Sequence, residues 1–243
     1  MRNPTAAMLV IGDEILSGRT RDANMHYLAG ELTTIGIDLM EVRVVSDIAS
    51  SIVAAVNDLR ASYDNVFTSG GIGPTHDDIT ADSIAQAFGL HIDVRDDARA
   101  ILEERYRDMG AQINETRMRM ARIPDTAVLI DNPISGAPGF SVDNVHVMAG
   151  VPTIFQAMVA SVLPTLTGGS PLLSQTLRID HGEGVVAGPL AKLAGEFPDL
   201  SIGSYPFQQK GAFGTNIVIR GHDGPRVDQA MTILAGLFPP GPV

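Results

Sequence analysis

Short apolar runs and amphipathic helical segments alternate through the first two-thirds of the chain. The apolar runs lie at 6–11, 39–45, 65–68, 127–130 and 145–148, and the helical segments at 23–35, 49–61, 78–88, 96–109 and 153–163. In the first helical segment, Met25, Leu28 and Leu32 recur every three or four residues and form one apolar face. Continuous apolar strands separated by such helices are typical of a parallel sheet with helices on both faces. The pattern therefore predicts an α/β fold with a mainly parallel sheet.

The composition changes between Pro164 and Pro171, where Thr, Gly, Ser and Pro indicate a linker. Strand-like segments follow at 174–180, 200–205 and 214–220, and helical segments at 186–195 and 227–237. The order β-α-β-β-α predicts a small two-layer α+β domain. We place the two predicted domains at residues 1–166 and 172–243 of the 243-residue chain.

The segment from Thr68 to Thr80, with the sequence TSGGIGPTHDDIT, joins an apolar run to a helical segment. Its glycines at positions 70, 71 and 73 allow a tight turn and a close approach of the backbone to a ligand. Backbone amides in such a loop, together with the following helix N-terminus, attract phosphate. Asp77 and Asp78 come next, where an anion alone would be repelled. The loop thus indicates a phosphate-bearing ligand that binds together with a hard divalent cation.

Other glycine-loop motifs differ from this segment in residue type. A Walker A loop needs a lysine, and none lies between Gly70 and Thr80. The dinucleotide fingerprint needs a third glycine where this chain has His76, and no G-x-S-x-G elbow is present. One alternative stays open, a plain strand-to-helix turn in which Asp77 or Asp78 caps the helix.

Acidic residues also follow the first two apolar runs. The carboxyl ends of parallel strands meet at one edge of the sheet, so we expect these acids to share a cleft with the glycine loop. The acids concerned are Asp13, Glu14, Asp22, Asp47, Asp77 and Asp78. Asp22 is also a natural N-cap for the first helix, and Glu14 has the alternative of bonding the backbone of its own loop.

The charge balance and the absence of cysteine exclude several classes of function. The chain has 17 basic and 28 acidic residues and a net charge of −11, which disfavours a nucleic-acid partner. With no cysteine, disulfides, thiolate metal sites and cysteine nucleophiles are excluded. The apolar stretch at 154–166 is interrupted by Pro164, and the N-terminal run is short for a signal sequence. We therefore predict a cytoplasmic protein with no membrane partner.

Taken together, these motifs resemble the molybdopterin-binding (MoaB/Mog-like) superfamily. The resemblance rests on GDEILSG at 12–18, Asp22 and Asn24, Asp47, and GGIGPTHDDIT at 70–80. Within that superfamily, the chain is similar to the N-terminal domain of competence/damage-inducible protein A and to the corresponding domain of FAD synthases. The segments at 132–139 and 149–152 fit the same pattern. The resemblance implies a three-layer α/β/α domain, a nucleotide or pterin pyrophosphate as ligand, and a homo-oligomer.

The resemblance also implies the roles of individual residues. Two acids used by the molybdopterin adenylyltransferases align with Asp47 and Asp78, but Ile72 stands where those enzymes have threonine. The more similar relatives hydrolyse pyrophosphates such as ADP-ribose or FAD with a divalent metal, so Mg, Mn or Co is expected here. We predict Asp47 and Asp78 as catalytic residues, and Asp47, Asp77 and Asp78 as metal ligands. The predicted ligand-binding residues are Gly12, Asp13, Glu14, Asn24, Gly70, Gly71, Gly73 and Thr75. The alternatives are a binding module without catalysis and an oligomerisation scaffold.

Two further groups of charged residues are explained by a solvated surface position rather than by a role in the site. His76 is a lone loop histidine, and a solvated side chain is favoured over a general base. A solvated helix face is the expected role of Arg117, Arg119 and Arg122, and the alternative is that they bind a phosphate group.

Overall fold

The computed structural model describes residues 2–209 and 212–239. The chain divides into two compact units, Met1–Gly169 and Ser170–Val243, and each is described by itself. Met1 and residues 240–243, at the outer ends of the two predicted domains, lie outside the described residues.

The first unit is built on a six-stranded sheet with the order β2-β1-β3-β8-β7-β6. The strands are β1 (Thr5–Ile11), β2 (Asp38–Val45), β3 (Asn65–Ser69), β6 (Val128–Ile130), β7 (Gly139–Val142) and β8 (Val145–Met148). The four strands β2, β1, β3 and β8 pair in parallel, whereas β7 and β6 add an antiparallel edge. The predicted mainly parallel sheet is confirmed, and its short antiparallel edge is a feature that the sequence pattern did not predict.

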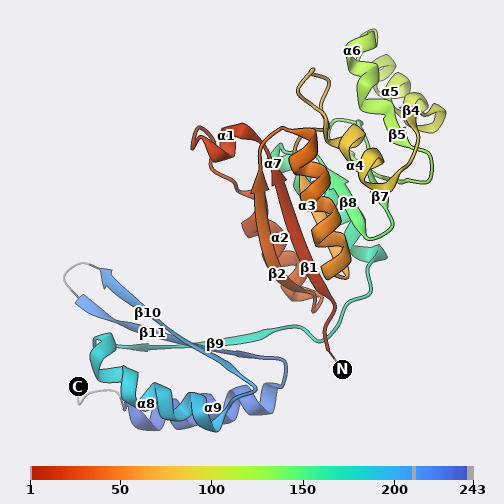
Figure 1. Ribbon diagram of the computed structural model, residues 1–243. Coiled ribbons are helices and arrows are strands. Elements are labelled where there is room, and N and C mark those ends of the chain that lie inside the picture. Colours follow the sequence, from red (N-terminus) through yellow and green to blue (C-terminus); the bar gives the residue numbers. More distant parts are fainter. Residues whose placement is uncertain (1, 210–211, 240–243) are drawn as a thin grey trace. The chain divides into compact units, whose positions relative to one another are not determined.

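Helices cover both faces of this sheet, as Figure 1 shows. The α-helices are α1 (Asp13–Leu16), α2 (Asn24–Thr34), α3 (Ala49–Ser62), α4 (Thr80–Phe88), α5 (Asp96–Asp108), α6 (Glu115–Met118) and α7 (Pro152–Val162). Two 3-10 turns, η1 (Arg119–Ala121) and η2 (Leu163–Thr165), and a two-stranded ribbon of β4 (Ile92–Val94) and β5 (Arg122–Pro124) complete the unit. Helices α3 and α4 pack on one face and α2 and α7 on the other, which confirms the three-layer α/β/α arrangement.

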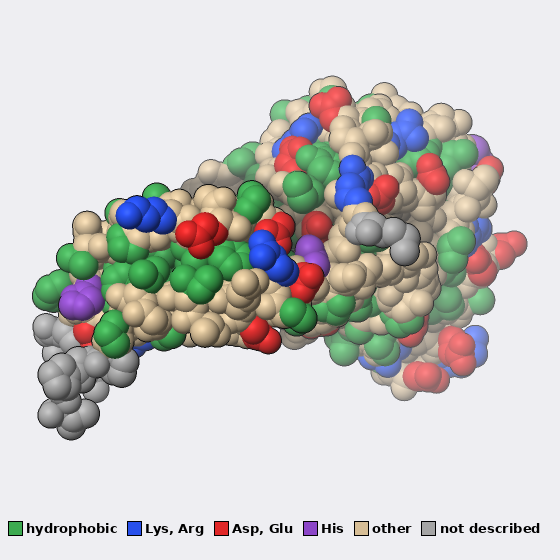
Figure 2. All heavy atoms as spheres, turned by 90° about the horizontal axis from the view of Figure 1, so that it is seen from below, with side chains coloured by type: hydrophobic (Ala, Val, Ile, Leu, Met, Phe, Trp, Pro, Cys, Tyr) green, Lys and Arg blue, Asp and Glu red, His purple; other side chains and the backbone are tan. Residues whose placement is uncertain are grey.

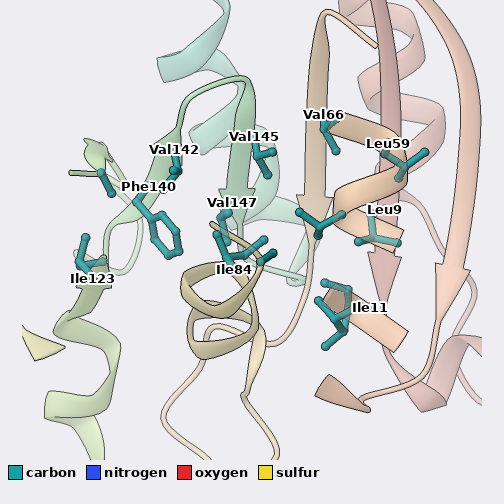
Figure 3. Packing of buried hydrophobic residues seen from close by; sticks show 14 of the residues in the cluster. Leu9, Ile11, Leu59, Val66, Ile84, Ile123, Phe140, Val142, Val145 and Val147 are labelled. Carbon is teal, nitrogen blue, oxygen red and sulfur yellow. The ribbon is translucent and has the colours of Figure 1, made fainter. Parts of the chain in front are cut away.

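Alternate residues of β1 enter two separate apolar cores. Leu9 and Ile11 pack with Leu59 of α3 and Ile84 of α4, as Figure 3 shows. Met8, on the opposite face, packs with residues of α2 and α7. Because β1 is buried on both faces, its sequence reads as a continuous apolar run.

The order of the strands fixes where a ligand site can form. Strand β1 lies between β2 and β3, so the chain leaves β1 through α2 on one face and returns through α3 on the other. A crevice opens outside the carboxyl ends of the strands at such a reversal, here between β1 and β3. The glycine loop follows β3 and therefore borders this crevice.

The second unit is a three-stranded antiparallel sheet with two helices. Its strands are β9 (Leu173–Ile179), β10 (Ser201–Gln209) and β11 (Ala212–Gly221), in the order β10-β11-β9, and its helices are α8 (Glu183–Glu196) and α9 (Gly224–Leu237). The predicted order β-α-β-β-α is confirmed. Figure 2 shows hydrophobic side chains gathered on the helical face of this unit, where Pro189, Leu193, Ile233 and Leu237 line a shallow groove.

No helix within residues 2–209 and 212–239 combines the length and the apolar character needed to traverse a bilayer.

Candidate functional site

A cavity of about 680 Å³ lies in the first unit at the carboxyl ends of β1, β3 and β8. Its wall includes the predicted residues Gly12, Glu14, Asp47, Gly70, Gly71, Gly73, Asp77 and Asp78. The structure thus brings together segments that follow three different strands, as the parallel sheet predicts.

The glycine loop is held so tightly that two of its positions exclude a side chain. Gly70 has φ of 110°, and a Cβ atom there would lie 2.3 Å from the carbonyl oxygen of Ile11. Gly71 has φ of 70°, and its Cβ would lie 2.1 Å from Thr80 Oγ1. Thr80 holds the loop by donating its hydroxyl to the Gly70 carbonyl at 3.0 Å and its amide to the Gly71 carbonyl at 2.9 Å. The loop backbone therefore packs directly against the end of β1, a position open only to glycine.

Asp78 closes a turn inside this loop. Its Oδ2 accepts hydrogen bonds from the amide of Thr75 at 2.8 Å and from Thr75 Oγ1 at 2.5 Å. The Thr75 hydroxyl is also the largest cause that lowers the pKa of the exposed Asp77 carboxyl. The hydroxyl has one proton to donate, and the distances place it on Asp78. Helix α4 begins at Thr80 without a side-chain cap, so the alternative of a helix-capping aspartate is wrong.

Asp47 is the acid whose protonation is most affected by its neighbours. Burial is the largest cause that raises the pKa of its carboxyl, against the opposing hydrogen bond that its Oδ2 accepts from the Asp13 amide at 2.9 Å. The like charges of Asp13, Glu14 and Asp77 raise the pKa further. This mutual repulsion shows that acids following β1, β2 and β3 converge at one site.

The donor atoms at the site are of the type that a hard cation prefers. Asp47, Asp77 and Asp78 offer only carboxylate oxygens, the ligands favoured by Mg²⁺ and Mn²⁺. Among the described residues, however, no group of three or more His, Asp or Glu side chains is already arranged to hold a metal ion. An ion at this site would need further oxygens from water or from a phosphate group, which is how nucleotide sites commonly hold Mg²⁺.

Three predicted ligand-binding residues do not line the cavity. Asn24 is buried, and its Nδ2 donates to Ser69 Oγ and to the Gly150 carbonyl, both at 2.8 Å, which ties α2 to the ends of β3 and β8. Asp13 is exposed and contributes its backbone amide to Asp47, while Thr75 acts through Asp78.

Two residues have the non-catalytic roles that the sequence favoured. Asp22 Oδ1 accepts a hydrogen bond from the amide of Met25 at 2.9 Å, so Asp22 satisfies a donor in the first turn of α2 from one position before the N-cap, Ala23. The side chain of His76 is 98% exposed, and its Nδ1 lies 3.8 Å from Asp77 Oδ1, which leaves it solvated.

The structure adds an apolar side to the site that the sequence did not predict. Ile72, Met120, Ile154, Met158 and Tyr106 also line the cavity, together with the acids and glycines. An apolar wall beside a few polar groups is typical of sites that hold the ring of a small organic ligand. Tyr106 comes from the last turn of α5, and no local sequence signal marks it.

Asn132 is a further cavity residue that sequence reasoning missed. It is buried, and its Oδ1 accepts hydrogen bonds from the amides of Ile134 and Ser135, both at 3.2 Å. Its Nδ2 donates to the Ala137 carbonyl at 2.8 Å. The sequence Asn-Pro-x-Ser-Gly at this point is a signal of a side-chain-stabilised turn, and could have identified it.

The expectation of a solvated arginine face is wrong. Arg122 pairs with Asp82, and Arg119 donates to the Asp78 carbonyl at 3.4 Å. The Arg117 guanidinium lies 4.7 Å from the centre of the Tyr106 ring. These side chains are partly buried, and η1 packs against α5.

Comparison with protein families gives two matches. Residues 7–168 match the family described as "Probable molybdopterin binding domain". Residues 171–243 match the family described as "FAD synthase, middle domain".

Individual proteins are similar over much of the chain. The crystal structure of the protein CinA from Thermoplasma acidophilum is 30% identical, with a TM-score of 0.62, and the match covers 68% of this chain and 99% of that one. A protein of Pyrobaculum calidifontis is 32% identical over 84% of this chain and 81% of its own length. The "Probable FAD synthase" of Caenorhabditis elegans is 31% identical over 96% of this chain. The chain spans about half the length of that last relative, 50% of it.

Proposed function

Because the chain belongs to the molybdopterin-binding domain family, we propose that its first unit binds a nucleotide or pterin pyrophosphate and cleaves it by metal-assisted hydrolysis. The substrates would be of the ADP-ribose or FAD type. One observation carries this proposal: acids from three strand ends converge on a glycine loop at a cavity with an apolar wall.

The two sides of the cavity suit the two parts of such a substrate. Backbone amides of Gly71 and Gly73 would hold the diphosphate oxygens, because no side chain intervenes at those positions. The Gly70 amide already donates to the Met148 carbonyl at 3.1 Å, so Gly70 would contribute by letting the backbone come close to the ligand. The apolar wall around Ile72 and Met120 would take a flat ring.

The carboxylates of Asp47, Asp77 and Asp78 would hold a divalent ion such as Mg²⁺, Mn²⁺ or Co²⁺. Without a cation, a diphosphate and these carboxylates would repel one another at short range. When bound, the ion would neutralise the diphosphate and lower the pKa of a coordinated water molecule.

Asp47 is suited to receive the proton of the attacking water. It lines the cavity beside the glycine loop, within the group of acids that would hold the ion and its water molecule. The water oxygen forms a bond to one phosphorus as its proton passes to Asp47, and the bridging P–O bond breaks. The two halves of the substrate then leave as phosphate monoesters, and Asp47 returns its proton to solvent.

The test is AMP release from ADP-ribose and from FAD by the purified full chain, with Mg²⁺, Mn²⁺ and Co²⁺ in turn. Asp78→Ala should lower the rate about 100-fold or more, which is about 2.7 kcal/mol in the barrier. Asp64→Ala, at the other end of the sheet, is the matched control and should retain activity. The absence of AMP release by the native chain with every metal would refute hydrolysis.

A second candidate is a binding module without turnover. One observation favours it: Asp78 Oδ2 is already engaged by two donors of Thr75. Calorimetry would then show equally tight binding of ADP-ribose by the native chain and by Asp78→Ala, with neither releasing AMP.

The proposal also includes assembly into a homo-oligomer in the cytoplasm, with small molecules rather than nucleic acid as partners. Light scattering of the purified chain tests the assembly, since a mass near 25.7 kDa would indicate a monomer.

A further inference from the structure

A second cavity, of about 930 Å³, lies in the first unit at the end of the sheet opposite the glycine loop. Its wall includes Pro4 before β1, Asn65 at the start of β3 and Asn144 before β8, all at the amino ends of parallel strands. This volume lies in the range of natural small-molecule sites. Nothing in the proposed hydrolytic site uses this cavity.

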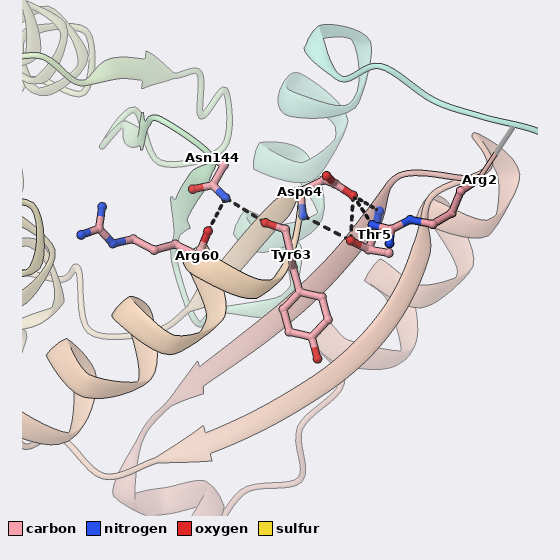
Figure 4. A network of polar contacts seen from close by, with 6 residues as sticks. All are labelled: Arg2, Thr5, Arg60, Tyr63, Asp64 and Asn144. Atoms are coloured by element: carbon pink, nitrogen blue, oxygen red, sulfur yellow. Dashed lines mark hydrogen bonds and ion pairs between the residues drawn. The ribbon is translucent and has the colours of Figure 1, made fainter.

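Much of the polar rim is already occupied by bonds within the protein, as Figure 4 shows. Asn144 Nδ2 donates to the carbonyls of Arg60 at 3.0 Å and Tyr63 at 2.9 Å. Asp64 accepts from Arg2 at 3.4 Å and from Thr5 at 2.7 Å. These side chains stabilise the rim and are not the groups that would recognise a ligand.

His146 differs from these rim residues. It lies on β8 in the face that packs against α2 and α7, beside the ring of Phe67 at 5.0 Å, where apolar side chains are the rule. The residue is 6% exposed and lines the cavity. Its Nδ1 is 2.9 Å from Ser141 Oγ, but its Nε2 has no hydrogen-bond partner among the described residues. An unpaired buried polar atom costs about 1–3 kcal/mol, and the great majority of such atoms in folded proteins are paired.

The charges around the cavity limit what can supply the missing partner. Burial lowers the pKa of His146 to about 4, so the ring is neutral at pH 7 and its Nε2 offers a single donor or acceptor. The charged residues in the wall are Arg2, Asp64, Asp131 and Asp143. Arg2 pairs with Asp64, which leaves two carboxylates that would repel an anion.

We propose that this cavity binds a neutral, nucleoside-sized molecule, one polar group of which bonds to Nε2 of His146. Val128, Val162 and Leu166 provide apolar surface for a ring, and Ser161 and Asn65 provide polar groups for hydroxyls. An added phosphate would meet Asp131 and Asp143, so a nucleotide binds more weakly than its nucleoside.

The experiment follows the Nε2 resonance of His146 by NMR in the full chain labelled with ¹⁵N-histidine, during titration with adenosine and, separately, with AMP. His146→Phe assigns the resonance. We expect adenosine to shift it, and AMP to require at least about tenfold higher concentration for the same shift, which is about 1.4 kcal/mol.

Val128→Trp provides the control that fills the cavity. Val128 is 70% exposed on the edge strand β6 and lines the cavity, so the larger side chain enters it without disturbing the core. This variant should lose the adenosine-dependent shift, whereas Asp78→Ala should keep it. The proposal is overturned if adenosine leaves the resonance unmoved, which is the result expected if the partner of Nε2 is only a buried water molecule. It is also overturned if the shift persists in Val128→Trp, or if AMP acts as strongly as adenosine.

Discussion

The same threonine–aspartate pair occurs at both ends of the sheet in the first unit. At the amino end, Asp64 Oδ2 accepts from the amide of Thr5 at 2.8 Å and from its hydroxyl at 2.7 Å. At the carboxyl end, Asp78 Oδ2 accepts from the amide of Thr75 at 2.8 Å and from its hydroxyl at 2.5 Å. The first pair joins residues 59 positions apart, whereas the second closes a turn of three positions.

The surroundings give the two pairs different roles. Asp64 has Arg2 as a counter-charge, and hydrogen bonds from the Thr5 amide and hydroxyl lower the pKa of its carboxyl. At the other end, Asp47 is partly buried among like charges, and the pKa of its carboxyl is raised. A carboxylate that is fully partnered stabilises the fold, whereas a cluster of repelling carboxylates remains able to bind a cation or a proton.

The largest expected effect concerns the carboxyl end, where the close packing of the glycine loop leaves no room for a side chain. Gly70→Ala places a Cβ 2.3 Å from the Ile11 carbonyl at φ of 110°, so we expect a loss of at least about 3 kcal/mol of unfolding free energy, or no folded protein. Gly18→Ala is the matched control, because Gly18 also has positive φ, of 73°, but no atom lies within 4 Å of its added Cβ. It should lose only about 1 kcal/mol, measured by urea denaturation. Equal losses in the two variants would show that the close packing of the loop is not the cause.

The next effect concerns the pair at the glycine loop. Thr75→Val removes the hydroxyl donor of Asp78 and keeps the branched shape, so the proposed AMP release should fall about tenfold, or about 1.4 kcal/mol in the barrier. The melting temperature should change little because the pair is exposed and local. Unchanged kcat and KM would mean that the turn does not position Asp78 for the reaction.

The opposite pattern is expected at the amino end. Thr5→Val removes the hydrogen bond that the Thr5 hydroxyl donates to Asp64 Oδ2 and the one that it accepts from the Asp64 amide at 3.3 Å. It should reduce stability by about 1 kcal/mol, which corresponds to a fall of about 2–4 °C in melting temperature. Catalysis should be unaffected, since neither residue lines the cavity at the glycine loop. Loss of activity at unchanged stability would contradict the division of roles between the two ends.

The smallest effect depends on pH. The folded-state pKa of Asp47 is raised, so its ionisation destabilises the native state as pH rises through that pKa. Asp47→Asn abolishes this loss while keeping an acceptor for the Asp13 amide, and should gain about 0.5 kcal/mol at pH 7. The gain should vanish below pH of about 4, where aspartate is protonated in the folded and unfolded states alike. Thermal melts at both pH values measure it, and a gain that persists in acid would exclude charge as the cause.

Much of the fold follows from periodicity in the sequence. Residues such as Leu28 and Leu32 repeat at helical spacing and lie in the core, and the apolar run of β1 is buried on both faces. Two features escaped prediction, the antiparallel edge and the ribbon of β4 and β5. Strands of three or four residues carry too little pattern to show their direction of pairing, which depends on contacts distant in sequence.

At the site, the sequence pointed to the loop and the acids because they lie in segments that follow strands. It could not show that Tyr106 reaches the cavity from α5, since that requires the path of the chain through α5 and α6. Nor could it show that the Nδ2 of Asn24 is bonded to Ser69 and Gly150, while its buried Oδ1 has no partner among the described residues. Residue type and position relative to a strand indicate chemistry, whereas the actual partners depend on tertiary packing.

The antiparallel edge of the sheet also has a consequence for the order of folding. Strands β7 and β8 join through a two-residue turn in which Asp143 has φ of 52°, so their pairing closes a very short loop. Pairing β1 with β3 instead requires distant segments to meet, which slows assembly. We expect pulsed hydrogen exchange to protect Val145 and Val147 before Gly70, and simultaneous protection would contradict this order. The glycine loop would then be completed last, which makes ligand binding a sensitive indicator of complete refolding.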